Sequence, residues 1–188
     1  MKKKYSQWFE KFKEVVANKE GTKSMKSLFN QTKNCKSISN DSEMAECVRN
    51  LMKNFDNKIS SNSKRYAIME DIGSICVQPM LQQVKEIRET SKTLFERIKK
   101  LNALYGEDYF ILKENEILSE LDRCLCHYGV AASDKLISPT YCQCSLGYMK
   151  ILFKTLLGEP VDVKMTETVL TGGNKCKFII KIPNLKDK

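Results

Sequence analysis

Cysteine is the residue type whose number and spacing most strongly suggest chemistry in this sequence. The chain of 188 residues contains eight cysteines, and five fall between positions 124 and 176: Cys124, Cys126, Cys142, Cys144 and Cys176. In a cytoplasmic protein most thiols are reduced, and clustered thiols indicate metal binding or catalysis before disulfides. Cys35, Cys47 and Cys76 are scattered singly. We expect Cys47 and Cys76, which sit among apolar residues, to pack as small hydrophobic side chains.

The pair Cys142 and Cys144 lies in a segment that the sequence predicts as a helix. Ser138 can cap this helix, Pro139 suits its first turn and Gly158 suits its end. Two residues along a helix turn by about 200°, so both cysteines cannot bind one ion from a regular helix. We expect Cys144 to face a site, and Cys142 to pack or to act as a reserve ligand.

The pair Cys124 and Cys126 is followed by His127, the only histidine of the chain. In a strand the two cysteines would share a face opposite His127, and in a loop all three side chains would be free. A thiol-dependent or zinc-dependent hydrolase that uses Cys124, Cys126 or Cys142 with His127 is therefore an alternative. We assign no catalytic residue, because the sequence shows no convincing set of acids and bases.

Residues 161–182 alternate apolar and polar side chains and contain Gly172-Gly173, which predicts a β-hairpin with a two-residue turn. Glu167 is the one carboxylate in the row of the first strand that should face the core, and a buried carboxylate is costly unless it is paired or metal-bound. The two-residue turn would set Glu167 opposite Phe178 and diagonal to Cys176, so that one ion could bind both. A one-residue bulge would break this geometry, and Glu167 could instead reach solvent or a lysine.

The stretch CQCSLGYMKILFKTLLGEPVDVKMTETVLTGGNKCKFIIKI, residues 142–182, carries a resemblance to a known family. It resembles the end of a vinyl-reductase-like (4-vinyl reductase) small-molecule-binding domain, and also a group of uncharacterised bacterial proteins with the same C-x-C-S-x-G helix and Gly-turn hairpin. The similarity covers roughly the last 65 residues. It implies an α+β domain that encloses a mostly apolar ligand pocket, with a structural zinc at the rim in some relatives.

The resemblance also implies a set of site residues. By motif, the zinc ligands of the relatives match Cys144, Glu167 and Cys176, whereas the remaining ligand position is Leu170 here. Cys126, Cys124 or Cys142 could replace the missing thiolate, and the metal set that we carry forward is Cys126, Cys144, Glu167 and Cys176. The expected pocket lining is Tyr141, Tyr148, Met149, Phe153 and Met165, each of which would serve equally well as ordinary core.

The elements that must position these residues follow from apolar periodicity. Residues 5–16, 40–55 and 65–105 have helical patterns, the last with a bend at Pro79 and an end at Gly106. The run 56–64 is the most linker-like part of the chain. We therefore expect an α+β fold, with a helical region at 1–106 and a smaller unit at 107–188 made of an antiparallel sheet and a helix packed on it. The two regions can also form one compact domain.

The net charge of +9 does not by itself indicate nucleic-acid binding. The basic excess is spread as single lysines over the first 70 residues, without a groove-reading motif, which favours a solvated surface. The N-terminal residues lack the apolar run of a secretory signal, and no apolar stretch is long enough for a transmembrane helix. We therefore expect a cytoplasmic protein.

The function that these patterns favour is non-catalytic and sensor-like. We expect a protein that binds a small apolar or aromatic molecule, with Zn as the cofactor. We expect no specific nucleic-acid partner and no membrane partner. The sequence does not decide whether the protein forms a homodimer. Besides the hydrolase, the remaining alternative is a helical interaction protein that docks a partner through its basic surface. Measurements of bound metal and of substrate turnover separate these three functions: binding protein, hydrolase and interaction protein.

Overall fold

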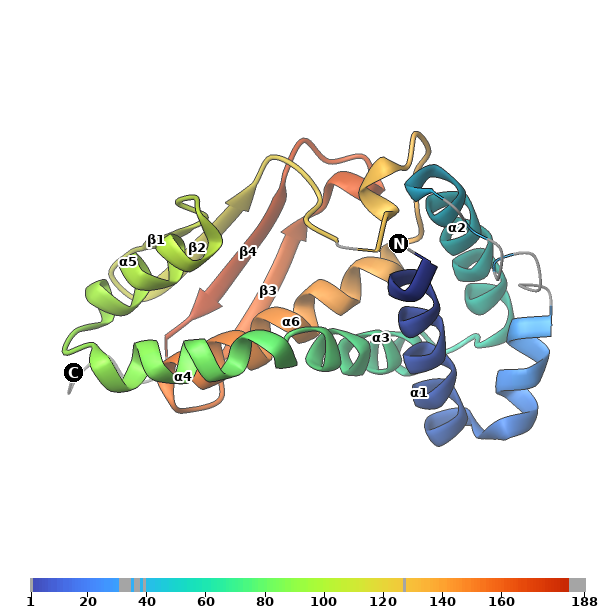
Figure 1. Cartoon of the computed structure of the whole chain (residues 1–188), viewed down its shortest axis with the longest axis horizontal. Coiled ribbons are helices and arrows are strands. Elements are labelled where there is room, and N and C mark those ends of the chain that lie inside the picture. The colour runs from blue at the N-terminus through green and yellow to red at the C-terminus, as the bar shows by residue number, and fades with distance from the viewer. Residues whose placement is uncertain (1, 31–34, 36–37, 39, 127, 183–188) are drawn as a thin grey trace.

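The computed structural model describes the chain except for residues 1, 31–34, 36–37, 39, 127 and 183–188 (Figure 1). The helices are α1 (Lys2–Phe29), α2 (Asp41–Lys58), α3 (Asn62–Cys76), α4 (Leu81–Thr90), α5 (Leu94–Tyr105) and α6 (Pro139–Leu157). The strands are β1 (Phe110–Leu112), β2 (Glu116–Leu121), β3 (Asp162–Glu167) and β4 (Cys176–Lys181), and short 3-10 turns are η2 (Gln78–Met80), η3 (Val130–Ala132) and η4 (Val169–Thr171). The predicted α+β class, helical first and then an antiparallel sheet, is confirmed.

The boundaries of the first helices follow from local signals. Gly21 has φ 83°, which bends α1 where the sequence breaks its apolar pattern. Asn40 caps α2, because its side chain accepts a hydrogen bond from the backbone N–H of Glu43. The run 56–64, predicted as linker-like, is mostly helical: α2 runs on to Lys58, Ile59 is buried, and α3 already begins at Asn62.

The predicted long helix over residues 65–105 is three helices. The chain leaves α3 after Cys76 and passes through the short turn η2, where Pro79 stands, before α4 begins. A second break follows Thr90, and Thr93 caps α5 by accepting a hydrogen bond from the Glu96 N–H. Gly106 ends α5 with φ 78°, as the sequence predicted.

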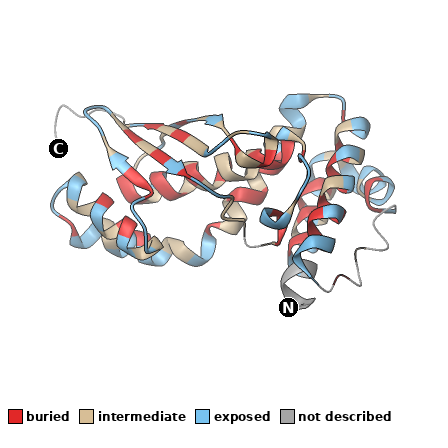
Figure 2. Cartoon of the chain, turned by 90° about the horizontal axis from the view of Figure 1, so that it is seen from above, coloured by how far each residue is buried: buried red, intermediate tan, exposed pale blue. Residues whose placement is uncertain are grey.

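The sheet is antiparallel, with the strand order β1-β2-β4-β3. In Figure 1, α6 runs beside the sheet, with α3 and α4 lying along it. Ser138 caps α6, Pro139 occupies its first turn and Gly158 ends it with φ 87°, so the predicted bounds are confirmed. Figure 2 shows buried residues along much of α6, and this helix thus forms the centre of the packed structure.

The buried side chains among the described residues form two hydrophobic cores. The first surrounds Trp8, Phe12 and Phe55 in α1 and α2, and the second surrounds Phe153 of α6 and Phe178 of β4. Each core contains residues from both predicted regions, 1–106 and 107–188. Tyr141 and Leu170 belong to the first core, and Val84 and Leu101 belong to the second.

Glycine residues set the distance between α3 and α6. A Cβ atom on Gly73 would overlap the carbonyl oxygen of Cys144, and one on Gly147 would overlap the carbonyl oxygen of Glu70. The two helices therefore cross with their backbones in contact, each through its own glycine. This crossing places Cys76, one helical turn after Gly73, beside the first half of α6.

The predicted register of the last hairpin is wrong at its tip. Met165 lies opposite Phe178 as part of a regular ladder, but a bulge follows and Glu167 lies opposite Lys177, not Phe178. The predicted two-residue loop is also replaced by η4, which ends at Gly172 with φ 100°. A one-residue slip moves a side chain to the other face of a sheet, so Glu167 leaves the core-facing row.

Candidate functional site

All eight cysteines lie in the described part of the chain, and six of them take no part in a disulfide: Cys76, Cys124, Cys126, Cys142, Cys144 and Cys176. They come from four separate places, which are the end of α3, the coil after β2, the first half of α6 and the start of β4. We call them the thiol cluster. All but one are half-buried, and Cys142 is buried.

The members of the thiol cluster lie within electrostatic reach of one another. Cys144 interacts with Cys126, Cys142, Cys76 and Cys124, and Cys126 also interacts with Cys76. Cys124 and Cys142 in turn interact with Cys176. The fold has therefore gathered thiols that are up to 100 residues apart in the chain (Cys76 to Cys176) around the coil that carries Cys124 and Cys126.

Aromatic hydroxyl groups flank the thiol cluster. The Sγ of Cys126 and the Oη of Tyr141 lie 3.0 Å apart in a hydrogen bond, and the Sγ of Cys76 lies 4.0 Å from the Oη of Tyr128. The ring of Trp8 stands 5.9 Å from that of Tyr141 and 6.3 Å from that of Tyr128. The cluster therefore borders the first core directly.

Burial sets the protonation state of these thiols. It raises the pKa of Cys124 to about 12 and that of Cys142 to about 11, and it raises the pKa of Cys144 well above the ordinary value. Burial also raises the pKa of Cys76 and of Cys176. Catalytic thiols need a lowered pKa, because the thiolate is the nucleophile. The environment of these five thiols opposes nucleophilic catalysis, and His127, proposed as their partner, lies outside the described residues.

The predicted metal ligands do not all meet. Cys126 and Cys144 belong to the same part of the thiol cluster, and Cys176 lies toward its sheet side, where it accepts a hydrogen bond from the Val169 N–H at 3.4 Å. Glu167 pairs with Lys177 at 2.7 Å and is bound by two backbone N–H groups of the turn. The described residues contain no group of three or more His, Cys, Asp or Glu already arranged to hold a metal ion.

The predicted pocket residues pack in two different cores. Tyr141 belongs to the first core, whereas Met149 and Phe153 are buried in the second. The hydroxyl groups of Tyr148 and Tyr105 form a hydrogen bond of 2.7 Å. Met165 packs against both cores. Each of them therefore has a packing role, and neither of the two cavities described below is lined by any of them.

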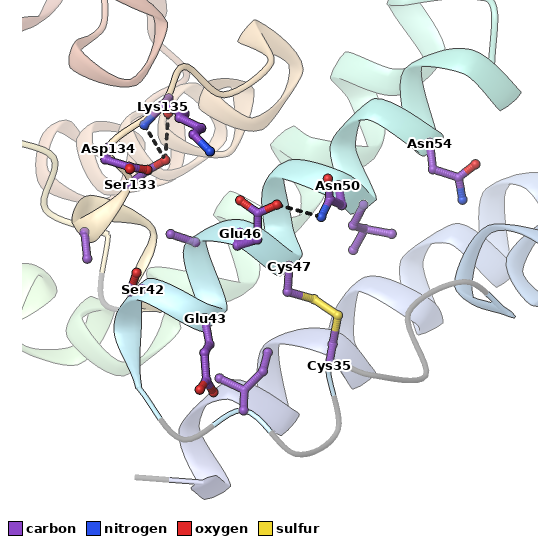
Figure 3. Close-up of a pocket in the computed structure, with 14 residues that line it drawn as sticks. Cys35, Ser42, Glu43, Glu46, Cys47, Asn50, Asn54, Ser133, Asp134 and Lys135 are labelled. Atoms are coloured by element: carbon purple, nitrogen blue, oxygen red, sulfur yellow. Dashed lines mark hydrogen bonds between the residues drawn. A yellow bond between two sulfur atoms is a disulfide. The ribbon is translucent and has the colours of Figure 1, made fainter.

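A cavity of about 720 Å³ lies between α2 and the coil that follows η3 (Figure 3). Its wall is polar on both sides, with Glu43, Glu46 and Asn50 on α2 and Asp134 and Lys135 opposite. The carboxylate of Glu46 accepts a hydrogen bond from Asn50 at 3.1 Å. Sequence reasoning missed this cavity, because its two walls are distant in the chain and neither wall has a recognisable motif.

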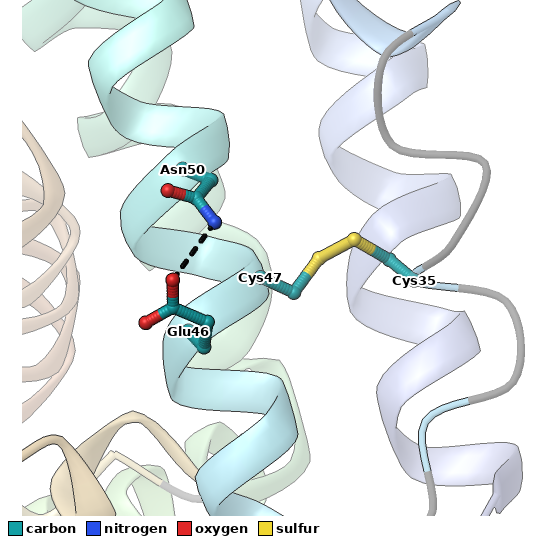
Figure 4. The surroundings of a disulfide bond; sticks show 4 residues. All are labelled: Cys35, Glu46, Cys47 and Asn50. Carbon is teal, nitrogen blue, oxygen red and sulfur yellow. Dashed lines mark hydrogen bonds between the residues drawn. A yellow bond between two sulfur atoms is a disulfide. The ribbon is translucent and has the colours of Figure 1, made fainter.

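A disulfide between Cys35 and Cys47 forms part of the same wall (Figure 4). It ties α2 to the segment that precedes it, with a Cα–Cα distance of 6.0 Å. Cys47 is buried, as predicted, but it is also oxidised, which corrects the expectation that it is a free packing residue.

A second cavity, of about 480 Å³, lies where the end of α1 meets the start of α3. Its wall includes Lys58 and Lys64. The Nζ of Lys58 donates to the carbonyl oxygen of Ser27 at 3.1 Å, and Lys64 pairs with Glu20 at 3.5 Å. These two basic groups are therefore engaged within the protein.

No helix among the described residues is both long and apolar enough to span a membrane.

Comparisons with known proteins locate the fold and the family. The structure is similar to the Fe(II) unliganded H-NOX protein from K. algicida, with a TM-score of 0.51 and 18% identity over 96% of this chain and 98% of that one. It is also similar to an H-NOX protein from S. oneidensis in the Fe(II) ligation state, carrying three substitutions, with a TM-score of 0.50 and 14% identity over 94% and 95%. These likenesses show an H-NOX-like fold.

A comparison with curated proteins gave no significant match. Residues 6–186 match a family model described as a family of unknown function, DUF6144, and the chain therefore belongs to that family.

Proposed function

We propose that this protein is a non-catalytic, sensor-like protein that binds a small molecule. The observation that carries the proposal is the likeness of almost the whole chain to an H-NOX protein that is described as unliganded, and hence as a protein that takes a ligand. The resemblance of residues 142–182 to vinyl-reductase-like binding domains points to the same class of function. The raised pKa values of five cysteines of the thiol cluster also favour binding over catalysis by a thiol.

The cavity beside α2 has the volume of a small-molecule site, since such sites commonly measure about 300–1,000 Å³. Its wall favours a polar ligand over the apolar molecule expected from the sequence. Glu46 is already paired with Arg49, so two further carboxylates, Glu43 and Asp134, face the ammonium of Lys135. A small molecule with an amine and several hydrogen-bonding groups would complement this charge.

The Fe(II) of the H-NOX proteins does not fit the described residues of this chain. An iron-bearing prosthetic group needs an interior cavity and an axial protein ligand. Here the rings of Trp8, Phe12 and Phe55 pack against one another inside the first core, and the 720 Å³ cavity beside α2 has polar side chains on both of its walls. We derive no step that involves iron.

The zinc site expected from the resemblance remains a proposal whose ligand set has to change. Glu167 is held by Lys177 and by the turn, so it would have to leave both to reach Cys144.

The proposal is tested by thermal unfolding of the purified protein with a panel of small polar amines and apolar aromatic molecules. We expect some members of the polar set to raise the midpoint of unfolding, because a ligand that binds only the folded state stabilises it. Those molecules should be recovered unchanged after long incubation. Consumption of a stabilising molecule would instead establish an enzyme.

A matched pair of variants locates the binding site. Asn50→Trp places a large ring in the cavity, whereas Asn57→Trp makes the same change on an exposed position of the same helix outside it. We expect the first variant to abolish the stabilisation and the second to retain it. Equal behaviour of the two variants would remove the cavity from the proposal.

A further inference from the structure

The second cavity, of about 480 Å³, has the charge and the hydrogen-bond donors of an anion site. Its wall includes three lysines, Lys23, Lys58 and Lys64, together with four serines. We propose that this cavity binds the phosphate group of a small soluble phosphate ester. The inference goes beyond the proposed function, which concerns the other cavity and a ligand of opposite charge.

Three helices bring these lysines to one place. Beyond its bend at Gly21, the second half of α1 lies beside the end of α2 (Figure 1), where the Nζ of Lys58 donates to the carbonyl oxygen of Ser27 at 3.1 Å. Only residues 59–61 separate α2 from α3, so Lys64 in the first turn of α3 lines the same cavity. The grouping of the lysines therefore follows from the packing of the helices.

The wall of the cavity has a net positive charge. The three lysines face one carboxylate, that of Glu20, which leaves a charge of +2. Lys23 is exposed and forms no ion pair with any residue that the structure describes. A phosphate monoester carries a charge of about −1.5 to −2 near neutral pH, so its charge matches that of the wall.

The two lysines that already have partners keep donors for a ligand. The Nζ of Lys58 bonds to the carbonyl oxygen and the hydroxyl of Ser27, at 3.1 and 2.5 Å, and both of these groups are neutral. The Nζ of Lys64 lies 3.5 Å from Glu20, and the side chain of Lys64 is 61% exposed. Because an ammonium has three N–H donors, each lysine can bind a phosphate oxygen and still keep its present partner.

The start of α3 adds positive potential to that of the lysines. Ser61 caps this helix of 15 residues by accepting a hydrogen bond from the Lys64 N–H at 3.4 Å, and Ser60 and Ser61 both line the cavity. The first N–H groups of a helix have no acceptor within the helix, and the partial positive charge at this end favours anions such as phosphate.

The size of the cavity and its hydroxyl groups favour an ester over a bare phosphate ion. Its volume of about 480 Å³ falls within the range of about 300–1,000 Å³ that is usual for small-molecule sites, so an organic group fits beside the phosphate. The hydroxyls of Ser24 and Ser60 in the wall can donate to and accept from hydroxyl groups of a ligand. A phosphorylated sugar or polyol has both kinds of group.

The test is calorimetric titration of the full chain with glucose 6-phosphate, glycerol 3-phosphate and inorganic phosphate, in a buffer free of phosphate. Glucose and glycerol are the uncharged controls. We expect at least one of the two esters to bind once per chain and more tightly than inorganic phosphate, and the uncharged controls not to bind. The proposal is wrong if neither ester binds, or if inorganic phosphate binds as tightly as the better ester.

Matched charge reversals separate the cavity from the general basic surface. Lys23→Glu and Lys26→Glu make the same change at exposed positions of α1, but only Lys23 lines the cavity. Lys23→Glu should weaken ester binding by at least about tenfold, because a charge-assisted hydrogen bond is lost. Lys26→Glu should weaken it by less than about threefold at physiological salt, where exposed charges are screened. Equal weakening by the two variants would contradict the site.

A second pair repeats the comparison on other helices. Lys64→Glu alters the cavity wall from α3, and Lys53→Glu is its control at an exposed position of α2 outside the wall. Far-UV circular dichroism establishes folding of each variant, and this second pair decides the matter if Lys23→Glu does not fold. Retention of ester binding by Lys64→Glu would contradict the site.

Two further measurements fix the source of the phosphate and the place where it binds. Vesicles of phosphatidylcholine with phosphatidic acid offer the same group on a lipid, and binding to these vesicles by a chain that binds neither soluble ester would overturn the proposal. Asn50→Trp, which alters the other cavity, should leave ester binding unchanged, and Lys23→Glu should leave the response to the amine panel unchanged. Loss of ester binding in Asn50→Trp would place the ester in the other cavity and would overturn this inference.

Discussion

The position of a single carboxylate, that of Glu167, departs from the metal site expected from the sequence. Glu167 would be a metal ligand if the last hairpin were regular, but a bulge after Met165 turns it to the outer face, where Lys177 and the turn hold it. In this position Glu167 stabilises the turn of the hairpin.

Glu167 gives a pH-dependent prediction. Lys177, followed by the backbone N–H groups of Lys175 and Asn174, lowers the pKa of Glu167 below its ordinary value. A carboxylate with a lowered pKa stabilises the folded state above the pKa of the unfolded chain, and the stabilisation is lost as the pH falls through the folded pKa. We expect the amides of Asn174 and Lys175 to lose protection from hydrogen exchange over that acidic range. In Glu167→Ala, which has no acceptor at this position, their protection should be low throughout and independent of pH.

The control for this experiment is Glu114→Gln, which alters an exposed carboxylate in the turn between β1 and β2. It should leave the two amides protected. If Glu167→Ala also leaves them protected, the carboxylate does not hold the turn.

At the scale of elements, the crossing of α3 and α6 organises both the packing and the thiol cluster. Local signals predicted the ends of α6 correctly, because Ser138, Pro139 and Gly158 act within a few residues of themselves. The approach of α3 to α6 could not be predicted in that way. In the sequence, Gly73 and Gly147 are simply residues of low helix propensity. The structure shows their role, because only a glycine leaves room for the backbone of the other helix at each position.

The crossing predicts the sign of a helix substitution. On helix propensity alone, Gly73→Ala should stabilise α3 by about 1 kcal/mol. The added methyl group would overlap the backbone of Cys144, however, and overpacking costs about 1–3 kcal/mol or more. We expect a net loss of roughly 2 kcal/mol in the free energy of unfolding, measured with urea.

Ala67→Gly, at an exposed position of the same helix, isolates the propensity term and should cost about 1 kcal/mol. A Gly73→Ala variant more stable than the unmodified chain would show that the helices are not in backbone contact.

At the scale of the whole molecule, the two cores share elements and should unfold together. Helix α6 contributes Tyr141 to the first core and Phe153 to the second, so neither core survives the loss of α6. The fold class and the helical-then-sheet order were predictable from periodicity and turn residues. The grouping of residues into two cores was not, because it depends on contacts between distant segments, such as that of Leu170 with the first core.

The cooperativity is measurable with a natural probe. Trp8 is the only tryptophan and is 1% exposed in the first core, so its fluorescence follows that core, while far-UV circular dichroism follows all helices. We expect both signals to change at the same urea concentration, as in a two-state transition. Separate transitions would indicate two independent units, with a boundary such as the one predicted at residue 106.

The disulfide between Cys35 and Cys47 has a practical consequence for work with this protein. It divides the cysteines into an oxidised pair on the wall of the polar cavity and six reduced thiols around α6. A reductant strong enough to keep the six thiols able to bind metal can also open the pair, and an oxidant that preserves the pair can consume the six. Preparations made with and without reductant are thus two chemical species, and each should be assayed separately for binding of small molecules and of zinc.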